Sequence, residues 1–257
     1  MKTIIANWKM NVGVRESVAL ARGTLLTLRG RKHLPELVIC PPSVALSEVR
    51  KVVARSGALL GAQNVFWEEA GAFTGEISAR MLQELGVTHA IIGHSERRHQ
   101  LGETDEMVNK KVLHVLEHQL TPILCVGETK QERQAGKSKE VVLGQLKAAL
   151  SGVRLRPSDH LLVAYEPVWA IGTGESATVA DIVEMQSSIR SLVQEILGER
   201  TLSQLRVLYG GSVDGENAYG FLREKEVDGV LVGGASVKIN QFRDIVHAAC
   251  EVLEAQT

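Results

Sequence analysis

Eight short runs of mostly aliphatic residues recur along the chain, and their spacing constrains the fold more than any other feature of the sequence. They lie at residues 3–7, 36–40, 59–63, 89–93, 121–126, 161–166, 205–210 and 228–232. Successive runs begin about 32 residues apart on average, which is the length of one strand followed by one helix. No linker or change of composition interrupts the pattern, so we expect one domain that spans residues 1–257.

The segments between these runs carry signals that are typical of helices. In one of them, apolar residues recur at steps of three and four, and they are Ile182, Met185, Ile189, Leu192, Val193 and Ile196. Thr178 precedes this segment as an N-cap, with Asp181 in place of the Glu or Gln of a capping box, and Gly198 follows as a C-cap. Ser78 and Gly86 bracket a shorter helical segment in the same way.

Strands that read as continuous apolar runs are buried on both faces, as the strands of parallel sheets are. Eight strand–helix units in succession close naturally into a barrel. No GxGxxG motif follows the first run, which argues against an open, doubly wound sheet, although that arrangement remains the alternative. The predicted fold class is α/β, with a single (β/α)8 barrel of parallel strands inside a ring of helices.

Charge and cysteine content limit the classes of partner and the compartment. The chain has 29 Lys plus Arg against 30 Asp plus Glu, so nothing predicts a general attraction to nucleic acid or to an anionic membrane. Three well-separated cysteines form no metal-type CxxC pair, which fits a reduced cytoplasm. The first ten residues return to charge too early for a signal-peptide core, and no apolar run approaches a membrane span.

Polar residues and glycines follow five of the runs, where a barrel places its functional groups. They are Asn7-Trp8-Lys9, His94-Ser95-Glu96, Glu166, Gly210-Gly211-Ser212 and Gly233-Gly234. Taken singly, Lys9 fits a solvated charge, His94 a helix-start residue and Glu166 an ion-pair partner. Their joint placement at one rim favours a functional site instead.

The glycine segments after the seventh and eighth runs indicate a phosphate site. Glycine lets the main chain approach an anion closely, and a helix that begins after Gly233-Gly234 adds oriented N–H groups. Two ordinary tight turns are the alternative. A site of this kind allows a chain with a formal charge of −1 to hold a phosphate without many basic side chains.

Glu166 and His94 have the characteristics of an acid–base pair. The uncharged segment after Glu166 can exclude water from the carboxylate, which makes it a stronger base towards a C–H proton. His94 lies at a probable helix start, where the dipole favours a neutral ring that can polarise a carbonyl. Lys9 is placed to stabilise an oxyanion.

With these residues assembled, the chain closely resembles the triosephosphate isomerase family from end to end. The matching segments occur in the family's order: NWKMN (7–11), GAFTGEIS (71–78), IGHSERR (92–98), CVGET (125–129), AYEPVWAIGTG (164–174), YGGSV (209–213) and LVGGAS (231–236). The resemblance implies interconversion of dihydroxyacetone phosphate and D-glyceraldehyde 3-phosphate through an enediolate, without a metal or organic cofactor. Glu166 is then the base, His94 the electrophile, Lys9 and Asn7 stabilise charge, and Glu96 supports Lys9.

The resemblance also implies how the substrate is held and enclosed. Phosphate is bound by the backbone amides of Gly172, Ser212, Gly233 and Gly234, with charge from Lys9. Residues 167–174 form a lid, whose members include Pro167, Val168, Trp169, Ala170, Ile171, Thr173 and Gly174. Tyr209 and Ser212 hold the closed lid, and Leu231 with Ile171 encloses the base. Trp169 belongs to the N-terminal hinge; simple packing is the alternative for Trp169 and Tyr209.

Residues 65–78 resemble the family's interdigitating dimer loop, with Phe73, Thr74, Gly75 and Glu76 at its centre. This implies a homodimer in which Thr74 supports the neighbouring subunit's site. The sequence departs from the family at Ala6, where Gly is usual, and at Glu175, where Lys is common. Two other functions remain open at this stage: a different phosphate-sugar isomerase on the same barrel, and a non-catalytic phosphate-binding scaffold.

Overall fold

The computed structural model describes residues 1–171 and 177–256, and it contains a closed barrel of parallel strands. The strands are β1 (Thr3–Asn7), β2 (Glu36–Cys40), β3 (Leu59–Ala62), β4 (His89–Ile92), β5 (Thr121–Val126), β6 (Leu161–Tyr165), β7 (Leu205–Tyr209) and β8 (Gly229–Val232). Each strand pairs with its neighbours in sequence, and β1 pairs with β8. The predicted (β/α)8 barrel is therefore confirmed, and the open-sheet alternative is wrong.

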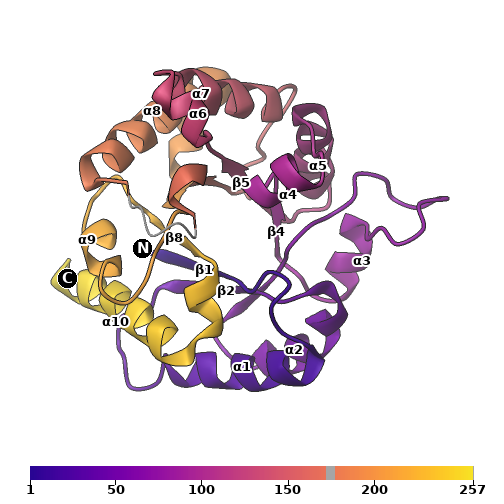
Figure 1. The fold of residues 1–257 in the computed structure, drawn as a ribbon. Helices are drawn as coiled ribbons and strands as arrows, with labels where there is room; N and C mark the ends of the chain where they lie inside the picture. Colours follow the sequence, from indigo (N-terminus) through magenta and orange to yellow (C-terminus); the bar gives the residue numbers. More distant parts are fainter. Residues whose placement is uncertain (172–176, 257) are drawn as a thin grey trace.

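Helices surround the strands on all sides of the barrel (Figure 1). They are α1 (Val14–Leu26), α2 (Leu46–Val53), α3 (Ala79–Glu84), α4 (Ser95–Gln100), α5 (Asp105–Glu117), α6 (Lys130–Gln134), α7 (Ser138–Ala149), α8 (Val179–Leu197), α9 (Ala218–Leu222) and α10 (Ile239–Ala255). Short 3-10 helices lie at η1 (Ser43–Ala45), η2 (Val168–Ala170), η3 (Glu199–Ser203) and η4 (Gly234–Val237). None of the helices in the described ranges is long and apolar enough to cross a membrane.

The predicted helix caps are present. Thr178 accepts a hydrogen bond from the Asp181 backbone N–H at 3.2 Å and begins α8, and Gly198 ends it with a φ of +90°. Asp181 does not return the bond as a capping-box residue would; its carboxylate pairs with Arg133 at 3.1 Å instead. Ser78 caps α3 in the same way as Thr178 caps α8.

Alternating strand residues build two hydrophobic layers, because successive side chains in a strand point to opposite faces. The inner layer fills the barrel and includes Ile5, Val38, Ile91 and Leu208. The outer layer packs the barrel against its helices. Ala6, the departure from the family pattern, is fully buried in this outer layer.

Polar side chains close the amino-terminal end of the barrel interior. The Arg206 guanidinium pairs with Glu36 and also donates to the Thr3 hydroxyl at 2.7 Å. His89 begins β4 on the same face as Ile91 and lies 2.8 Å from the Thr88 hydroxyl through Nδ1. Burial, assisted by the charges of Arg206 and His160, lowers the pKa of His89 to about 4.

This shift predicts a loss of stability in mild acid. His89 is neutral in the folded protein, whereas the unfolded chain takes up a proton near pH 6.5, so acid favours unfolding. As the pH falls from about 6.5 to about 4, His89 should account for about 3 kcal/mol of lost unfolding free energy. Denaturant unfolding of the wild type and His89→Gln across this range measures the effect. Parallel pH dependence in the two proteins would contradict it.

Candidate active site

One cavity of about 460 Å³ opens where the carboxyl ends of several strands converge. It brings together most of the predicted catalytic and phosphate-binding residues, and two of the predicted lid residues. Its lining includes Asn7, Lys9, His94, Glu166, Ile171, Gly210, Ser212, Leu231, Gly233 and Gly234. These residues come from segments that follow or end five different strands. Closure of the barrel therefore assembles side chains that are up to 227 positions apart, from residue 7 to residue 234.

Glu166 follows β6 and is almost fully buried. Its backbone N–H donates to Val126 at 2.8 Å, and Gly127 makes this close approach possible because a Cβ there would lie 1.7 Å from the Glu166 carbonyl oxygen. The carboxylate Oε2 accepts a hydrogen bond from the Ser95 N–H at 2.9 Å. Oε1 has no hydrogen-bond partner among the described residues. A buried carboxylate oxygen without a donor is available to accept a proton.

His94 lies beside this oxygen and begins α4. Its Nδ1 accepts a hydrogen bond from the Glu96 backbone N–H at 3.3 Å, which assigns the proton of a neutral ring to Nε2. Nε2 lies 3.0 Å from Glu166 Oε1, although the pair lacks the alignment of a hydrogen bond. A neutral imidazole that presents an N–H group to the cavity can polarise a carbonyl oxygen.

Lys9 is held in a strained position. Its φ of +50° lies in the left-handed region, which costs about 1 kcal/mol for a residue with a side chain. Its N–H donates to Asn7 Oδ1 at 3.0 Å, and its carbonyl accepts from Gln63 at 2.8 Å. The ammonium pairs with Glu96 Oε1 at 2.5 Å. The side chain passes over Gly233, where a Cβ would lie 3.0 Å from Lys9 Cε.

The glycine segments after β7 and β8 line the cavity opposite His94. The backbone N–H groups of Ser212, Gly233 and Gly234 donate to no acceptor within the described residues. The helix expected after this glycine pair begins at Gly234 as the short 3-10 helix η4. Ser236 donates to Gly233 O at 2.6 Å and holds this turn. Unpaired amides at a rim of this kind can hold an anion. Gly172, the fourth predicted donor, lies outside the described residues.

The first half of the predicted lid packs against the rim. After Pro167, the 3-10 helix η2 contains Val168, Trp169 and Ala170. The Ser212 hydroxyl donates to Ala170 O at 2.5 Å, so the loop after β7 contacts the lid. Thr173, Gly174 and Glu175 lie outside the described residues.

Tyr209 is fully buried beneath this contact, and its hydroxyl packs against Gly211, where a Cβ would lie 2.3 Å from it. Burial raises the pKa of Tyr209 to about 12, and the backbone of Ala177 acts in the opposite direction. The Tyr209 side chain thus lies between the loop after β7 and Ala177.

Glu128 is a residue that the sequence reasoning missed. It is fully buried, and its Oε1 accepts hydrogen bonds from Trp169 Nε1 at 2.9 Å and from the Tyr165 hydroxyl at 3.2 Å. Arg133 lies over the Trp169 ring, 4.1 Å from its centroid. The predicted hinge residue is therefore anchored by a carboxylate. Glu128 lies inside the CVGET segment that matches the family, and this match was the signal in the sequence that could have identified it.

A second missed residue, Glu103, supports the His94 segment from behind. Its Oε1 accepts from the Gly93 N–H at 3.0 Å, and its Oε2 pairs with Arg97 and with the buried Lys111 at 2.9 Å. Burial acts to raise the pKa of Glu103, but the two cations outweigh it and hold the pKa below its usual value. The carboxylate is thus charged and fixes the turn that precedes His94.

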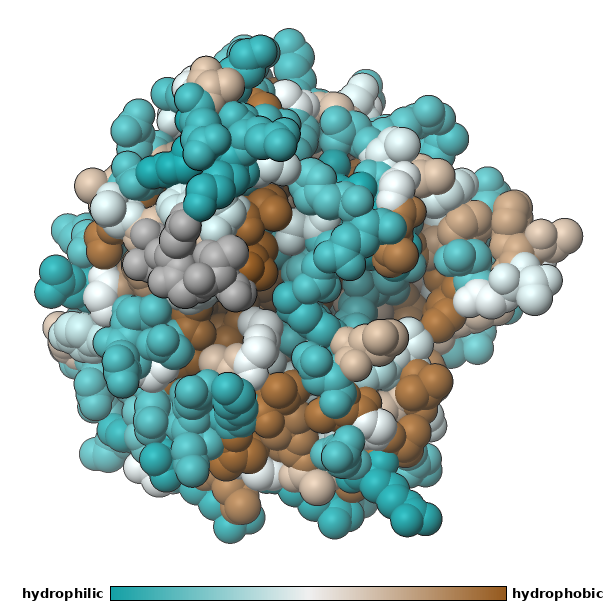
Figure 2. Space-filling view, in the orientation of Figure 1, coloured by the Kyte–Doolittle hydropathy of each residue, from teal (hydrophilic) through white to brown (hydrophobic). Residues whose placement is uncertain are grey.

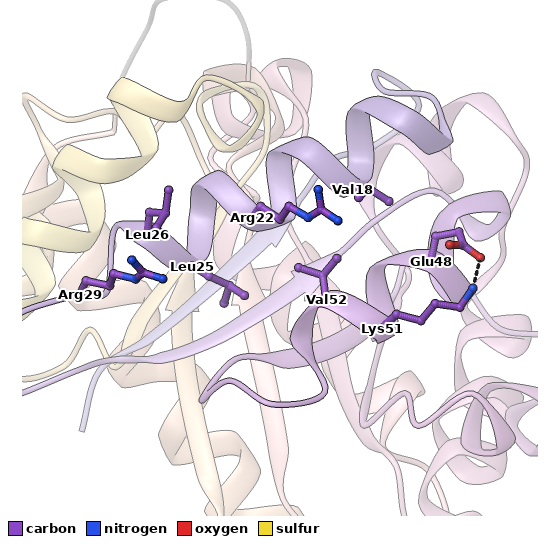
Figure 3. Close-up of a pocket in the computed structure, with 8 residues that line it drawn as sticks. All are labelled: Val18, Arg22, Leu25, Leu26, Arg29, Glu48, Lys51 and Val52. Carbon is purple, nitrogen blue, oxygen red and sulfur yellow. Dashed lines mark hydrogen bonds and ion pairs between the residues drawn. The ribbon is translucent and has the colours of Figure 1, made fainter.

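Another groove lies on the outside of the barrel, between α1 and α2 (Figure 3). Arg22, Arg29 and leucines line it, and Glu48 pairs with Lys51 at its edge. It has no histidine and no buried carboxylate. Among the described residues, the predicted acid–base pair of Glu166 and His94 therefore lies in the rim cavity and not in this groove.

Comparison with known proteins agrees with this geometry. The family model described as triosephosphate isomerase matches residues 2–249. The triosephosphate isomerase of Caldanaerobacter subterraneus subsp. tengcongensis is 49% identical over 244 residues, which cover 95% of this chain and 98% of that protein. The triosephosphate isomerase of Aquifex aeolicus is 46% identical over 247 residues, which cover 96% of this chain and 99% of that protein.

The Glu103 network predicts a large loss of stability when its charge is removed. Glu103→Gln should lower the unfolding free energy by about 3–5 kcal/mol, because it leaves the buried Lys111 ammonium without its counter-charge. Glu106→Gln makes the same charge change at an exposed ion pair on α5 and should leave the unfolding free energy nearly unchanged, because solvent screens that pair. Urea unfolding of both variants measures the difference. Equal, small effects would contradict the proposed support.

Proposed function

This chain belongs to the triosephosphate isomerase family and is an aldose–ketose isomerase of triose phosphates, and we propose that Glu166, His94 and Lys9 carry out its proton transfers. The reaction interconverts dihydroxyacetone phosphate and D-glyceraldehyde 3-phosphate, a step shared by glycolysis and gluconeogenesis. The observation that carries the proposed roles is the approach of Glu166 Oε1 to His94 Nε2, at 3.0 Å, inside the rim cavity. Family membership favours this reaction over another phosphate-sugar isomerase or a non-catalytic scaffold.

Glu166 is the proposed base because its two oxygens differ. Oε2 is fixed by the Ser95 N–H, and Oε1 has no donor among the described residues. A substrate C–H beside Oε1 gives its proton to that oxygen, and the same carboxylic acid returns the proton to the neighbouring carbon. One carboxylate thus moves the proton between the two carbons of an enediolate.

His94, Lys9 and Asn7 are the proposed partners of the substrate oxygens. The neutral ring of His94 donates from Nε2 to the carbonyl oxygen, which acquires negative charge as the C–H bond breaks. The Lys9 ammonium stabilises the same charge, and Glu96 fixes its position through the 2.5 Å ion pair. Asn7 holds the turn of Lys9 through its side-chain oxygen.

The phosphate of the substrate fits the opposite side of the cavity. The unpaired N–H groups of Ser212, Gly233 and Gly234 supply oriented donors, and Lys9 supplies a full charge. Lys238 also lines the cavity and adds a second cation, which the sequence reasoning did not identify. Gly172 stays a predicted fourth amide donor.

Residues 167–174 are the proposed lid over this site. Ile171 and Leu231 line the cavity next to Glu166, so closure over the substrate excludes water from the carboxylate. The contacts of Ala170 with Ser212 and of Trp169 with Glu128 provide the fixed side of the hinge. Exclusion of water protects the enediolate from loss of phosphate.

A homodimer is the proposed assembly, formed through the segment between β3 and α3. This segment projects from the barrel in Figure 1, and Figure 2 shows hydrophobic side chains at the same edge. Phe73 is 42% exposed near its tip, and Met10, Val44 and Met81, which follow β1, β2 and β3, are exposed as well. When a second subunit covers these side chains, Thr74 of each subunit lies near Asn7 and Lys9 of the other.

We further propose that residues 1–257 form one catalytic domain that works in the cytoplasm without a metal or organic cofactor. The closed barrel contributes every proposed catalytic residue from a single chain. All three cysteines are buried and unpaired, which supports a reducing compartment.

The proposed base is tested by Glu166→Gln. Loss of a general base should lower kcat for D-glyceraldehyde 3-phosphate by about 10²–10⁴-fold, while KM changes little. Steady-state kinetics of the wild type and the variant measure the change. Glu140→Gln, an exposed position on α7, is the matched control and should retain wild-type turnover. A folded Glu166→Gln variant with unchanged kcat would overturn the assignment.

The proposed dimer is tested by Phe73→Asp. A charge at this exposed aromatic should prevent association, and turnover should fall by about tenfold or more because Lys9 loses the support of its neighbour's Thr74. Sedimentation velocity and kcat on the same samples measure both effects. Leu202→Asp, with a similar exposure of 39%, is the control and should remain dimeric and active. A Phe73→Asp monomer with full turnover would show that the neighbouring subunit is not needed.

A further inference from the structure

A cluster of potential metal ligands lies outside the active-site cavity, on the surface of α5. Glu69, His114 and His118 each offer one ligand atom, and these three atoms lie within 4.8 Å of one another. His118 Nε2 and Glu69 Oε2 are 2.8 Å apart. None of the three residues lines the cavity that contains Glu166.

The sequence and the fold both bring these residues together. His114 and His118 are four positions apart at the end of α5, so they share one face of the helix. Glu69 comes from the segment between β3 and α3, whose base packs along the same helix. Trp67 lies under the Lys110 ammonium, 5.8 Å from it, and Asn64 accepts from Lys111 at 2.7 Å.

The hydrogen bonding of His114 is incomplete. Its residue surface is only 8% exposed, and its Nε2 has no hydrogen-bond partner among the described residues. Its ring meets that of His118 edge-on, with centroids 4.6 Å apart. A buried ring nitrogen without a partner is rare in native proteins and calls for a ligand or a water.

Charge in this region favours a cation. The His114 ring is buried and lies against the His118 ring. Glu69, Glu117 and Glu68 all act electrostatically on the same ring with negative charge. Arg80 is an opposing cation, 3.7 Å from Glu69 Oε1, and Glu69 Oε2 lies 2.8 Å from His118.

A simple ion pair between Glu69 and His118 is the less demanding interpretation. It accounts for their 2.8 Å contact, but it leaves the buried His114 Nε2 without a partner among the described residues. A bound metal ion accounts for all three side chains at once.

We propose that Glu69, His114 and His118 form a binding site for a divalent transition-metal ion of the Zn²⁺ type. Two imidazole nitrogens and one carboxylate oxygen are ligands that Zn²⁺ and Co²⁺ accept in tetrahedral geometry, with a fourth position open to water. Such ligands lie about 2.0–2.2 Å from the metal, so the three atoms must move closer than their present limit of 4.8 Å. Glu69 is exposed and can rotate to achieve this.

The site joins two parts of the molecule that are otherwise held by side-chain contacts. A metal ion bound there ties the base of the β3–α3 segment to α5. The ion takes no part in the isomerase reaction, and the inference does not depend on the proposed catalytic roles. Its effect is to order a segment whose tip is proposed to contact the second subunit.

Titration of the metal-free, untagged protein with Co²⁺ tests the site directly. The wild type should bind one Co²⁺ per chain, with the intense visible absorption of a tetrahedral nitrogen and oxygen environment, and Zn²⁺ should displace it. Glu69→Gln and His118→Gln should each weaken binding by more than about tenfold. His33→Gln, a histidine outside the cluster, should bind as the wild type does.

The two variants at accessible positions keep the test valid even where a change at the buried His114 disturbs folding. Circular dichroism of Glu69→Gln and His118→Gln should match that of the wild type, because Glu69 is exposed and His118 is only partly buried. Absence of saturable binding, equal binding in all variants, or a thiolate charge-transfer band would each overturn the proposal. The last result would place the ion on one of the buried cysteines.

Discussion

Closure of the barrel through the pairing of β1 with β8 is the constraint on which the site depends. Thr3–Ala6 pair in parallel with Gly229–Val232. At Gly229 a Cβ would lie only 1.9 Å from the Thr3 carbonyl oxygen, so no side chain fits at this position between β1 and β8. Because the strands meet there without a gap, the ends of β1 and β8 become neighbours. Lys9 from one and Gly233 from the other then form one wall of the cavity, although they are 224 positions apart.

Close packing around glycines also positions Glu166, the proposed base. Gly127 allows the Glu166 main chain to lie against the turn after β5, and Gly210 leaves space for the Glu166 side chain, whose Cγ would be 2.9 Å from a Cβ at that position. The glycines that follow β5 and β7 thus determine the position of the Glu166 carboxylate. Because the Ser95 N–H also holds Oε2, the proposed base has few alternative positions, and the geometry proposed for catalysis is present without substrate.

Sequence reasoning located every strand to within one residue at each end, because aliphatic runs and turn residues are local signals. It also placed Lys9, His94 and Glu166 at strand ends, and the barrel geometry then put them in one cavity. It missed Glu103 and Glu128, whose importance comes from partners such as Lys111 and Trp169 that only the folded chain supplies. The pairing of Glu69 with His118 is non-local in the same way, since no spacing rule links a loop to a helix 49 positions later.

Helix α5 connects the site to the segment proposed for dimer contact. On one side, Lys111 neutralises Glu103, which fixes the turn before His94. Next to Lys111, Lys110 packs on Trp67, and His118, just after the end of the helix, pairs with Glu69. The helix therefore also contacts the start of the projecting segment. A metal ion or a second subunit that orders residues 64–69 of this segment acts on α5, the helix that also supports the turn before His94, the proposed electrophile. Because Lys111 bonds both Asn64 and Glu103, a displacement of the segment reaches the Gly93 turn through only two side chains.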